Sequence, residues 1–549
     1  MTPKAPSPAS STEVSQGVVR SASIMSFAVA LSRVSGLVRE MVMSRLFGAS
    51  MPYDAFRIGF QIPNLTRDLF AEGALSSAFV PVFTDYLQNK GREEAARLAN
   101  LVTTTLILVV GTLCAAGALA SAHLVRLAAA GFANTPGKAE LAAHLTSIMF
   151  PFLLLVALAA QAMGILNALK QFAVPALSST FFNIGSVAAG LVLGLGLGPQ
   201  LAITPIEGMA WGVLVGGALQ LGFQIPALVR AGFRFRPALD FSHPGLRSIL
   251  VMMGPAILGN AATQINVLVN SSLASTIVDP LRGADGPVSW LGYAFRFMQL
   301  PIGLFGVAIA SATLPAISRS ASAGNLDEFR RTLSRSLGLV FLLTIPSSVG
   351  LVLVGRAMIG AVYEGFKFQA YDTEQTAVAL SGFCIGLAGY SAQKVLAPSF
   401  YALKDARTPM LVSLASVMVN FSLAWFLVRV LGFGHAGLAL ATSGIAIFTS
   451  LTLFLLIRRR AEGLYGRMLF ESLWRVLAAS AAMGAAVWAL VRWLESAPYV
   501  LQLALAIPAG VVVFYAACRA LRIEELALAT EAFAGPLARR FPRWFKPTP

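Results

Sequence analysis

The sequence predicts an all-α polytopic membrane protein with about 14 transmembrane helices, arranged as two repeated six-helix lobes plus two extra C-terminal helices. Three observations predict this fold class. Apolar residues dominate the composition, apolar runs of about 20 residues recur along the whole chain, and basic residues gather in alternate connecting loops.

The composition excludes an ordinary soluble domain. Of the 549 residues, 56% are hydrophobic and 12% are charged, and the mean hydropathy is +0.73. A soluble domain carries about 25% charged residues, so much of this surface must face lipid. The strands of a membrane barrel appear in a sequence as short segments of alternating hydrophobicity, and these runs are not of that kind. Helices remain as the structure that pairs the backbone amides and carbonyls in lipid.

Apolar runs separated by polar breaks give the expected helices. They cover residues 21–47, 54–86, 97–123, 141–168, 175–198, 206–229, 246–274, 289–317, 331–354, 376–400, 409–431, 435–457, 472–495 and 498–521. The first six form an N-lobe (20–230), the next six a C-lobe (246–458), and the last two a pair at 471–522. Residues 1–19 are interpreted as a disordered cytoplasmic tail and 523–549 as a basic cytoplasmic tail.

Basic residues set the predicted orientation. With the N-terminus inside, the inner loops hold most lysines and arginines, and every inner loop carries at least one. A missed or extra helix would invert this pattern downstream, so the charges support an even number of spans with both termini cytoplasmic. The same bias explains the net charge of +16, and no nucleic-acid partner is expected.

An internal repeat relates the two predicted lobes. The Asn-Ala-Leu-Lys at 167–170 and the Tyr-Ala-Leu-Lys at 401–404 lie about 234 residues apart, an offset far longer than the period of a solenoid repeat. Each stretch precedes a proline at the same distance. Six helices per repeat place both halves in the same orientation, as in transporters that bind substrate between halves and alternate access. The last two helices either only enlarge the bundle or hold a lipid tail against the second half.

Several charged residues lie inside the expected spans. The basic ones are Arg33, Arg39, Arg57, Arg67, Arg296, Lys394 and Arg475. A cation at mid-helix costs about 2.5–3.5 kcal/mol on insertion scales, so a functional role is the default interpretation. One alternative is that ion pairs hold the helices together. The sum of the cations exceeds the nearby acids, however, and this excess favours an anionic ligand whose phosphate oxygens suit arginine.

The acids and small residues fall in the same two helices. Polar residues of the second helix step by three or four and form one stripe: Asp54, Arg57, Gln61, Asn64, Asp68 and Glu72. On the first helix, Ser32, Gly36, Arg39 and Glu40 share a face.

The sequence contains no Walker A motif, no zinc-ligand spacing and no nucleophile elbow. We therefore expect a transporter without a cofactor and not an enzyme. Its energy would come from an ion gradient, the membrane potential or substrate turnover.

Several stretches resemble the MurJ (MviN) lipid II flippases. They include Ser32 to Glu40, Phe47 to Ala49, Pro63 to Ala74 with the pattern Asn-Leu…Arg…Phe-Ala-Glu-Gly-Ala, and Val288 to Trp290. The resemblance runs over nearly the whole chain. It implies the fold of the MOP exporter superfamily. It also implies that lipid II, the undecaprenyl-diphosphate-linked peptidoglycan precursor, moves from the inner to the outer leaflet of a bacterial inner membrane during cell wall biogenesis.

The resemblance also implies roles for individual residues. It assigns substrate binding to Arg33, Arg39, Arg296, Ser289 and Ser32, with the arginines on the diphosphate, and gating or substrate entry to Asp54, Arg67, Glu72 and Gly36. Some relatives carry an acidic residue where this chain has Phe295, and some hold sodium with acids at positions that match Asn270 and Ala424. With Asn420 retained, Asn270 and Asn420 are weak metal candidates, and no metal site is expected. The protein is expected to act as a monomer.

Three alternatives stay open at this point. A related exporter of drugs or of another polyprenyl-linked sugar would share the lobes but lack the arginine set of the first two helices. A membrane-embedded polymerase or phosphatase would need a catalytic residue on a sizeable extramembrane loop, and the outer loops here are short. A scaffold without transport activity would leave the cost of the intramembrane arginines unexplained.

Overall fold

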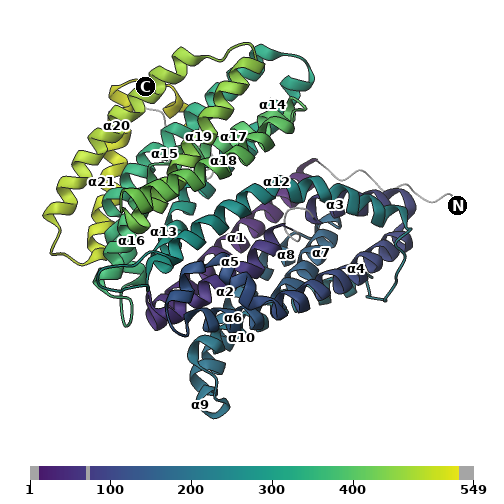
Figure 1. Cartoon of the computed structure of the whole chain (residues 1–549). Helices are drawn as coiled ribbons and strands as arrows, with labels where there is room; N and C mark the ends of the chain where they lie inside the picture. Colours follow the sequence, from purple (N-terminus) through teal and green to yellow (C-terminus); the bar gives the residue numbers. More distant parts are fainter. Residues whose placement is uncertain (1–10, 70–74, 531–549) are drawn as a thin grey trace. The chain divides into compact units, whose positions relative to one another are not determined.

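The computed structural model describes residues 11–69 and 75–530, without the side chains of residues 11–27, 76–77, 255–256 and 258–259. This part of the chain is helical, and its β-type pairing is limited to two isolated bridges, Asp279–Gly283 and Gly365–Phe368 (Figure 1). The chain divides into two compact units, Met1–Gln264 and Ile265–Pro549. The boundary between them falls inside one long helix.

Unit 1 is a bundle of helices that ends within α12. Its helices are α1 (Ser11–Phe47), α2 (Met51–Arg67), α3 (Ser76–Asp85), α4 (Arg92–Leu119), α5 (Ser121–Ala128), α6 (Lys138–Met149), α7 (Phe152–Ala168), α8 (Ala173–Leu191), α9 (Gly198–Leu201), α10 (Pro205–Gly222), α11 (Ile225–Arg230) and the first part of α12 (Pro244–Ser275). Shorter turns are the π-helical η2 (Tyr86–Lys90) and η4 (Val192–Gly196) and the 3₁₀ turn η3 (Ala130–Asn134).

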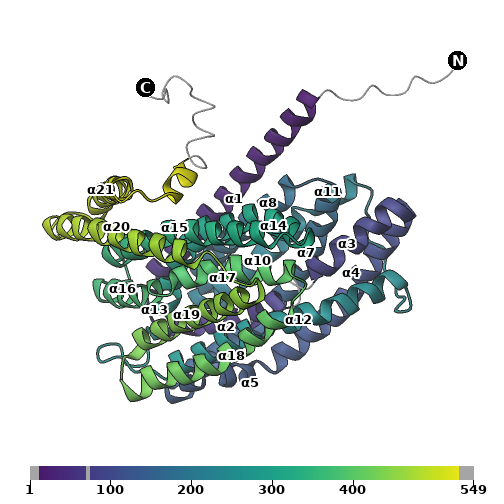
Figure 2. The same cartoon turned by 90° about the horizontal axis from the view of Figure 1, so that it is seen from above.

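Unit 2 continues from α12. Its elements are α13 (Pro287–Pro301), the π-helical η5 (Ile302–Val307), α14 (Ala308–Ser322), α15 (Leu326–Tyr363), α16 (Ala370–Cys384), α17 (Leu387–Ala402), α18 (Arg407–Trp425), the π-helical η6 (Phe426–Val430), α19 (Gly434–Arg460), α20 (Gly466–Trp493) and α21 (Tyr499–Ala520). The last two helices lie side by side in both views and pack on α15 through a buried cluster that includes Leu342, Val476 and Cys518 (Figure 2).

The helix bounds repeat at the spacing seen in the sequence. The offset that separates Lys170 from Lys404 also separates α8 from α18 and η4 from η6, both where these elements begin and where they end. Lys170 and Lys404 themselves both adopt the left-handed conformation, with φ of 62° and 60°. The two units therefore share a local plan, whereas their division into six-helix lobes stays a prediction.

Ten helical segments in the described residues are long and apolar enough to span a membrane. All ten coincide with expected spans, and the total of about 14 stays a prediction. Some expected spans consist of consecutive helices. For example, α6 and α7 meet at Pro151, which has no amide hydrogen, and α16 and α17 meet at Gly386, whose amide donates to Ser443 Oγ.

The first helix also begins earlier than expected. Helix α1 starts at Ser11, so residues 11–19, predicted as part of a disordered tail, have a helical backbone. The prolines of this region end at Pro8, and the following residues carry nothing that prevents a helix. Residues 1–10 and 531–549 of the two predicted tails lie outside the described residues.

Glycines bring α10 into direct backbone contact with α8 and with η4, which continues α8, in unit 1. A Cβ on Gly208 would lie 2.3 Å from the Cα of Gly194, and one on Gly212 would lie 2.3 Å from the carbonyl oxygen of Ser186. Stripes of small residues let helices approach closely in lipid, where close packing and hydrogen bonds drive association. This contact fixes α8, which also packs against α1.

Candidate functional site

Arg39 and Glu40 lie where α1 meets α2 and α8. The Arg39 Nη2 donates to Glu40 Oε1 at 3.3 Å, and the hydroxyl of Tyr53 on α2 donates to Glu40 Oε2 at 3.3 Å. The Arg39 guanidinium also lies 5.3 Å from the centroid of the Phe182 ring on α8. The arginine is 17% exposed and the glutamate is buried. Three helices therefore hold this guanidinium in place, through a carboxylate and an aromatic face.

A second contact of α1 with α8 uses Ser32, Gly36 and Asn183. The Asn183 amide on α8 donates to the Ser32 carbonyl at 3.2 Å and to Ser35 Oγ at 3.1 Å. A Cβ on Gly36 would lie 3.4 Å from Asn183 Nδ2, so glycine at this position keeps the amide close to α1. Asn183 was not singled out from the sequence because a lone asparagine in an apolar helix has no distinguishing pattern.

The arginines predicted to bind substrate or to gate its entry differ in their surroundings. Arg33 on α1 is exposed, and within residues 11–69 and 75–530 it forms no ion pair. Arg67 is held by its neighbour, with Nε and Nη2 donating to Asp68 Oδ1 at 3.1 and 2.9 Å. Adjacent acids therefore neutralise Arg39 and Arg67 in part, through pairs between neighbouring residues that do not join separate helices. Glu72 lies outside the described residues.

A fully buried ion pair joins α2 to α6. The ammonium of Lys138 lies 2.9 Å from Asp54 Oδ2, and neither side chain is exposed. The same ammonium lies 4.7 Å from the centroid of the Phe132 ring. Burying two charges is costly, and removing either partner leaves the other charge buried without compensation. The folded state therefore needs Lys138 to balance the charge of Asp54. Lys138 precedes the expected span 141–168, and its only local signal is a lysine that follows Gly137 at the start of an apolar run.

The corresponding helix of unit 2, α13, carries two more residues predicted to bind substrate. Ser289 is fully buried, whereas Arg296, two turns further on, is exposed. Phe295 packs edge-on against Phe383 of α16 at a centroid distance of 5.5 Å. This position is therefore committed to aromatic packing here.

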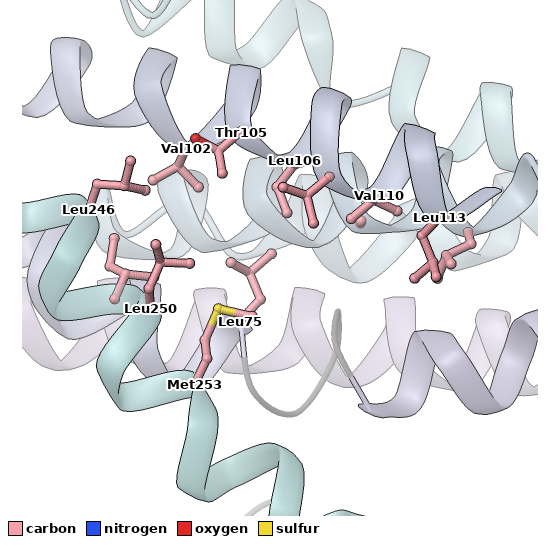
Figure 3. A pocket seen from close by; sticks show the side chains of 13 residues that line it. Leu75, Val102, Thr105, Leu106, Val110, Leu113, Leu246, Leu250 and Met253 are labelled. Carbon is pink, nitrogen blue, oxygen red and sulfur yellow. The ribbon is translucent and has the colours of Figure 1, made fainter. Parts of the chain in front are cut away.

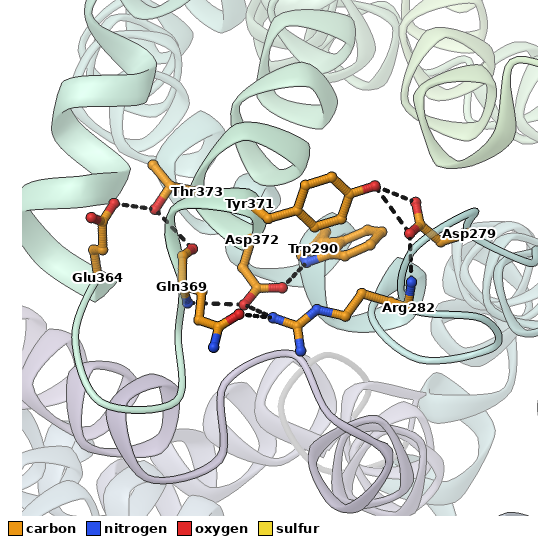
Figure 4. Close-up of polar contacts among 8 residues, drawn as sticks. All are labelled: Asp279, Arg282, Trp290, Glu364, Gln369, Tyr371, Asp372 and Thr373. Atoms are coloured by element: carbon orange, nitrogen blue, oxygen red, sulfur yellow. Dashed lines mark hydrogen bonds and ion pairs between the residues drawn. The ribbon is translucent and has the colours of Figure 1, made fainter.

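A polar network closes the end of unit 2 at which α13 and α16 begin (Figure 4). The buried carboxylate of Asp372 accepts from Trp290 Nε1 at 3.1 Å and from Arg282 Nη2 at 2.8 Å. It also accepts from the backbone amide of Gln369 at 3.0 Å. The Tyr371 hydroxyl donates to both oxygens of Asp279 at 3.0 and 2.9 Å. These contacts tie the loop before α13 to the start of α16.

The two weak metal candidates lie in contact within unit 2. Asn420 Nδ2 donates to Asn270 Oδ1 at 3.1 Å, and Asn270 Nδ2 donates to Thr442 Oγ1 at 3.1 Å. The amide oxygens of Asn266 and Asn420 are buried and accept no hydrogen bond. This cluster therefore offers oxygen ligands of the kind hard cations use, but no carboxylate to balance a charge. In the described part of the chain, no three His, Cys, Asp or Glu side chains gather as a metal site.

Comparison with known proteins places this chain among membrane transporters. The family model described as lipid II flippase MurJ matches residues 43–509. The lipid II flippase MurJ of Burkholderia cenocepacia is 35% identical over 440 residues, covering 79% of this chain and 82% of the relative. The probable lipid II flippase MurJ of Vibrio cholerae is 35% identical over 505 residues, covering 88% and 91%.

Solved structures agree with the sequence relatives. A lipid II flippase MurJ in an inward closed conformation superimposes with a TM-score of 0.73 at 25% identity, covering 90% of this chain and 99% of that one. An inward-facing MATE family transporter of the MOP superfamily gives a TM-score of 0.60 at 16% identity, covering 80% and 94%. The second likeness shows a shared fold.

Proposed function

Because this chain belongs to the MurJ family of lipid II flippases, we propose that it moves lipid II from the inner to the outer leaflet of a bacterial inner membrane. The observation that carries this proposal is the match of residues 43–509 to the family model. The protein would then be a transporter in peptidoglycan synthesis rather than an enzyme, and it would contribute to cell shape.

We propose that Arg33, Arg39 and Arg296 bind the diphosphate, with Ser32 and Ser289 beside them. A guanidinium presents a planar fork of donors that matches phosphate oxygens, and it stays charged at every physiological pH. The contacts of Arg39 with Glu40 and Phe182 support this role, because a guanidinium already held in place loses little freedom on binding.

We propose gating roles for Asp54, Arg67, Glu72 and Gly36. The pairing of Asp54 with Lys138 means that Asp54 would act by fixing the start of α2 against α6. Gly36 would act by letting α1 lie close to Asn183 of α8. The wider proposal includes about 14 transmembrane helices in two six-helix lobes with two further helices, both termini in the cytoplasm, alternating access and a monomer.

The test is complementation in cells depleted of their own lipid II flippase. The wild-type chain should restore growth, whereas Arg33→Ala, Arg39→Ala and Arg296→Ala should fail although each reaches the membrane at normal abundance. Arg492→Ala, which removes an exposed arginine from the last turn of α20, is the matched control and should rescue as wild type does.

The outcomes separate the substrate from the fold. A wild-type chain that is abundant in the membrane but does not rescue would overturn lipid II as the substrate and favour another polyprenyl-linked sugar or amphiphile. Normal rescue by all three arginine variants would overturn the assignment of the diphosphate site. A lipid II accumulation assay in the same cells would show that any failure lies in flipping rather than in an earlier step.

A further inference from the structure

We propose that unit 1 holds one anionic membrane phospholipid. One acyl chain would lie in an apolar groove between α4 and α12, and the phosphate would meet arginines at one end of that groove. This inference concerns a surface that none of the predicted substrate or gating residues lines.

The groove is built from two facing rows of apolar side chains (Figure 3). Val102, Leu106, Val110 and Leu113 step along α4, and Leu246, Leu250 and Met253 step along α12. Leu75 and residues of α7 complete the lining. Thr105, the one polar residue of the lining, donates its hydroxyl to the Leu101 carbonyl, so it offers no free donor. The lining suits hydrocarbon and excludes a polar ligand.

The groove is open along one side. Val109 and Leu113 of α4 are 59% and 37% exposed, and Leu250 of α12 is 46% exposed, whereas Leu246 and Leu75 at its floor are buried. In a membrane-spanning unit, large apolar side chains that border an open groove meet lipid rather than water. A chain in the groove would cover these side chains and fill space that protein atoms leave empty.

Arginines gather where the groove begins. The segment 231–243 runs from α11 to α12 and lies along the first turns of α4, since the Arg236 amide donates to Asn100 Oδ1 at 3.1 Å and the Ala238 amide to Thr104 Oγ1 at 3.1 Å. Arg234, Arg236 and Arg247 are exposed, and within the described residues none of them forms an ion pair. Arg247 directly follows Leu246 of the groove lining.

Two acids nearby are already engaged. Glu94 and Asp240 lie 3.8 and 3.9 Å from the guanidinium of Arg97, and Glu94 also lies 4.0 Å from His243. The Arg92 guanidinium donates to the Ala231 carbonyl. This leaves Arg234, Arg236 and Arg247 as an excess of positive charge at a helix end, the arrangement that attracts anionic lipid headgroups.

The length of the groove argues for a phospholipid rather than for a prenyl chain. Val102 and Leu113 are eleven residues apart on a helix, so the row on α4 is about 16 Å long. Half of a bilayer core measures about 15 Å, so the groove matches an acyl chain of one leaflet. A prenyl chain many isoprene units long would extend far beyond it.

The experiment is native mass spectrometry of the full-length protein in mild detergent, titrated with palmitoyl-oleoyl phosphatidylglycerol or the matching phosphatidylcholine. We expect one retained phosphatidylglycerol and weaker retention of phosphatidylcholine. A triple variant, Arg234→Gln with Arg236→Gln and Arg247→Gln, should weaken phosphatidylglycerol binding by roughly a hundredfold, about fivefold for each arginine. Val109→Trp, which fills the groove, should remove the same bound lipid while leaving the arginines in place.

The matched control is Arg458→Gln with Arg459→Gln and Arg460→Gln, which removes the same charge from the end of α19 in unit 2. It should leave the retained phosphatidylglycerol unchanged. The proposal is overturned if this control loses the lipid equally, or if Val109→Trp retains it. It is also overturned if undecaprenyl phosphate displaces the lipid from wild type more readily than phosphatidylglycerol does, because the groove would then hold the prenyl tail. None of these outcomes depends on rescue of growth, so they are independent of the proposed function.

Discussion

The two units place a buried charge at the same point of the repeat, but with opposite sign. Lys138, the first residue of α6, and Asp372, in the first turn of α16, are separated by the same offset as Lys170 and Lys404, and both side chains are fully buried. Their partners come from the corresponding helices, Asp54 of α2 and Trp290 of α13. The repeat therefore fixes where the helices meet, whereas each unit uses its own chemistry to hold them together.

Helix polarity explains why the two arrangements need different partners. The positive end of a helix dipole favours an anion and disfavours a cation. Asp372 therefore gains from its place at the start of α16, and it also accepts from the Gln369 amide and a partly exposed Arg282. Lys138 sits at the unfavourable end of α6, so its charge relies on the carboxylate of Asp54 and the ring of Phe132.

The largest expected effect is on the unit 1 pair. Lys138→Met leaves Asp54 buried without its cation, which should cost about 3–5 kcal/mol of stability. We expect a lower melting temperature, measured by tryptophan fluorescence of the purified protein, and reduced abundance in the membrane. The double variant with Asp54→Asn should recover most of the loss. A single variant as stable as wild type would show that the pair does not anchor α2 to α6.

The same double variant separates stability from transport. If Asp54 acts only by anchoring α2, the stable double variant should also restore growth in the complementation assay. Failure to rescue at normal abundance would assign Asp54 a direct part in gating.

A smaller effect is expected in unit 2. Asp372→Asn keeps an acceptor for Trp290 Nε1 but loses the charge-assisted bond to Arg282, so the cost should be about 1.5–3 kcal/mol. Thermal unfolding of this variant and of Lys138→Met, measured under the same conditions, tests which of the two substitutions destabilises the protein more. Equal or larger destabilisation by Asp372→Asn would mean that the charge of this carboxylate contributes more to stability than its bond to Arg282 alone accounts for.

Helix packing offers a third contrast between the units. A Cβ added to Gly212 of α10 would lie 2.8 Å from the Cα of Gly190 on α8. In unit 2, the residues at the same positions counted from the starts of α19 and α18 are alanines, Ala441 and Ala424. Gly212→Ala should therefore destabilise unit 1 by about 1–3 kcal/mol through overpacking. Gly222→Ala, at the end of the same helix with open space around it, is the control. Equal melting temperatures for both variants would show that α8 and α10 can separate without cost.

The sequence predicted those features of the fold that depend on composition and periodicity. Apolar runs indicated the spans, and the Leu-Lys turns at Lys170 and Lys404 indicated the repeat spacing, because both are local signals. The pairing of Lys138 with Asp54 joins residues 84 positions apart, and no local pattern reports it. The contact of Asn183 with Ser32 is likewise a product of tertiary packing, which fixes partners that charge patterns alone leave open.

The smallest expected effect concerns the loops after α7 and α17. Both loops close in the same way, with the Gln171 amide donating to the Leu166 carbonyl at 2.8 Å and the Asp405 amide to the Phe400 carbonyl at 2.9 Å. Only unit 2 has an acid at this position, because Asp405 stands where unit 1 has Gln171. Hydrogen bonds from the backbone amide and hydroxyl of Thr408, with Arg460 nearby, lower the pKa of Asp405.

A lowered pKa sets the direction of the pH dependence. The ionised carboxylate stabilises the folded state above the unfolded pKa of about 3.9, and this contribution is lost as the pH falls through the lower folded pKa. The melting temperature should therefore depend on Asp405 at pH 6, and this dependence should weaken as the pH falls through the folded pKa of Asp405. In a comparison with wild type, Asp405→Ala should lower it at pH 6 and have less effect at pH 3, whereas Gln171→Ala should show no such change with pH. An Asp405→Ala deficit that grows as the pH falls would mean that the protonated acid, not the carboxylate, holds the start of α18.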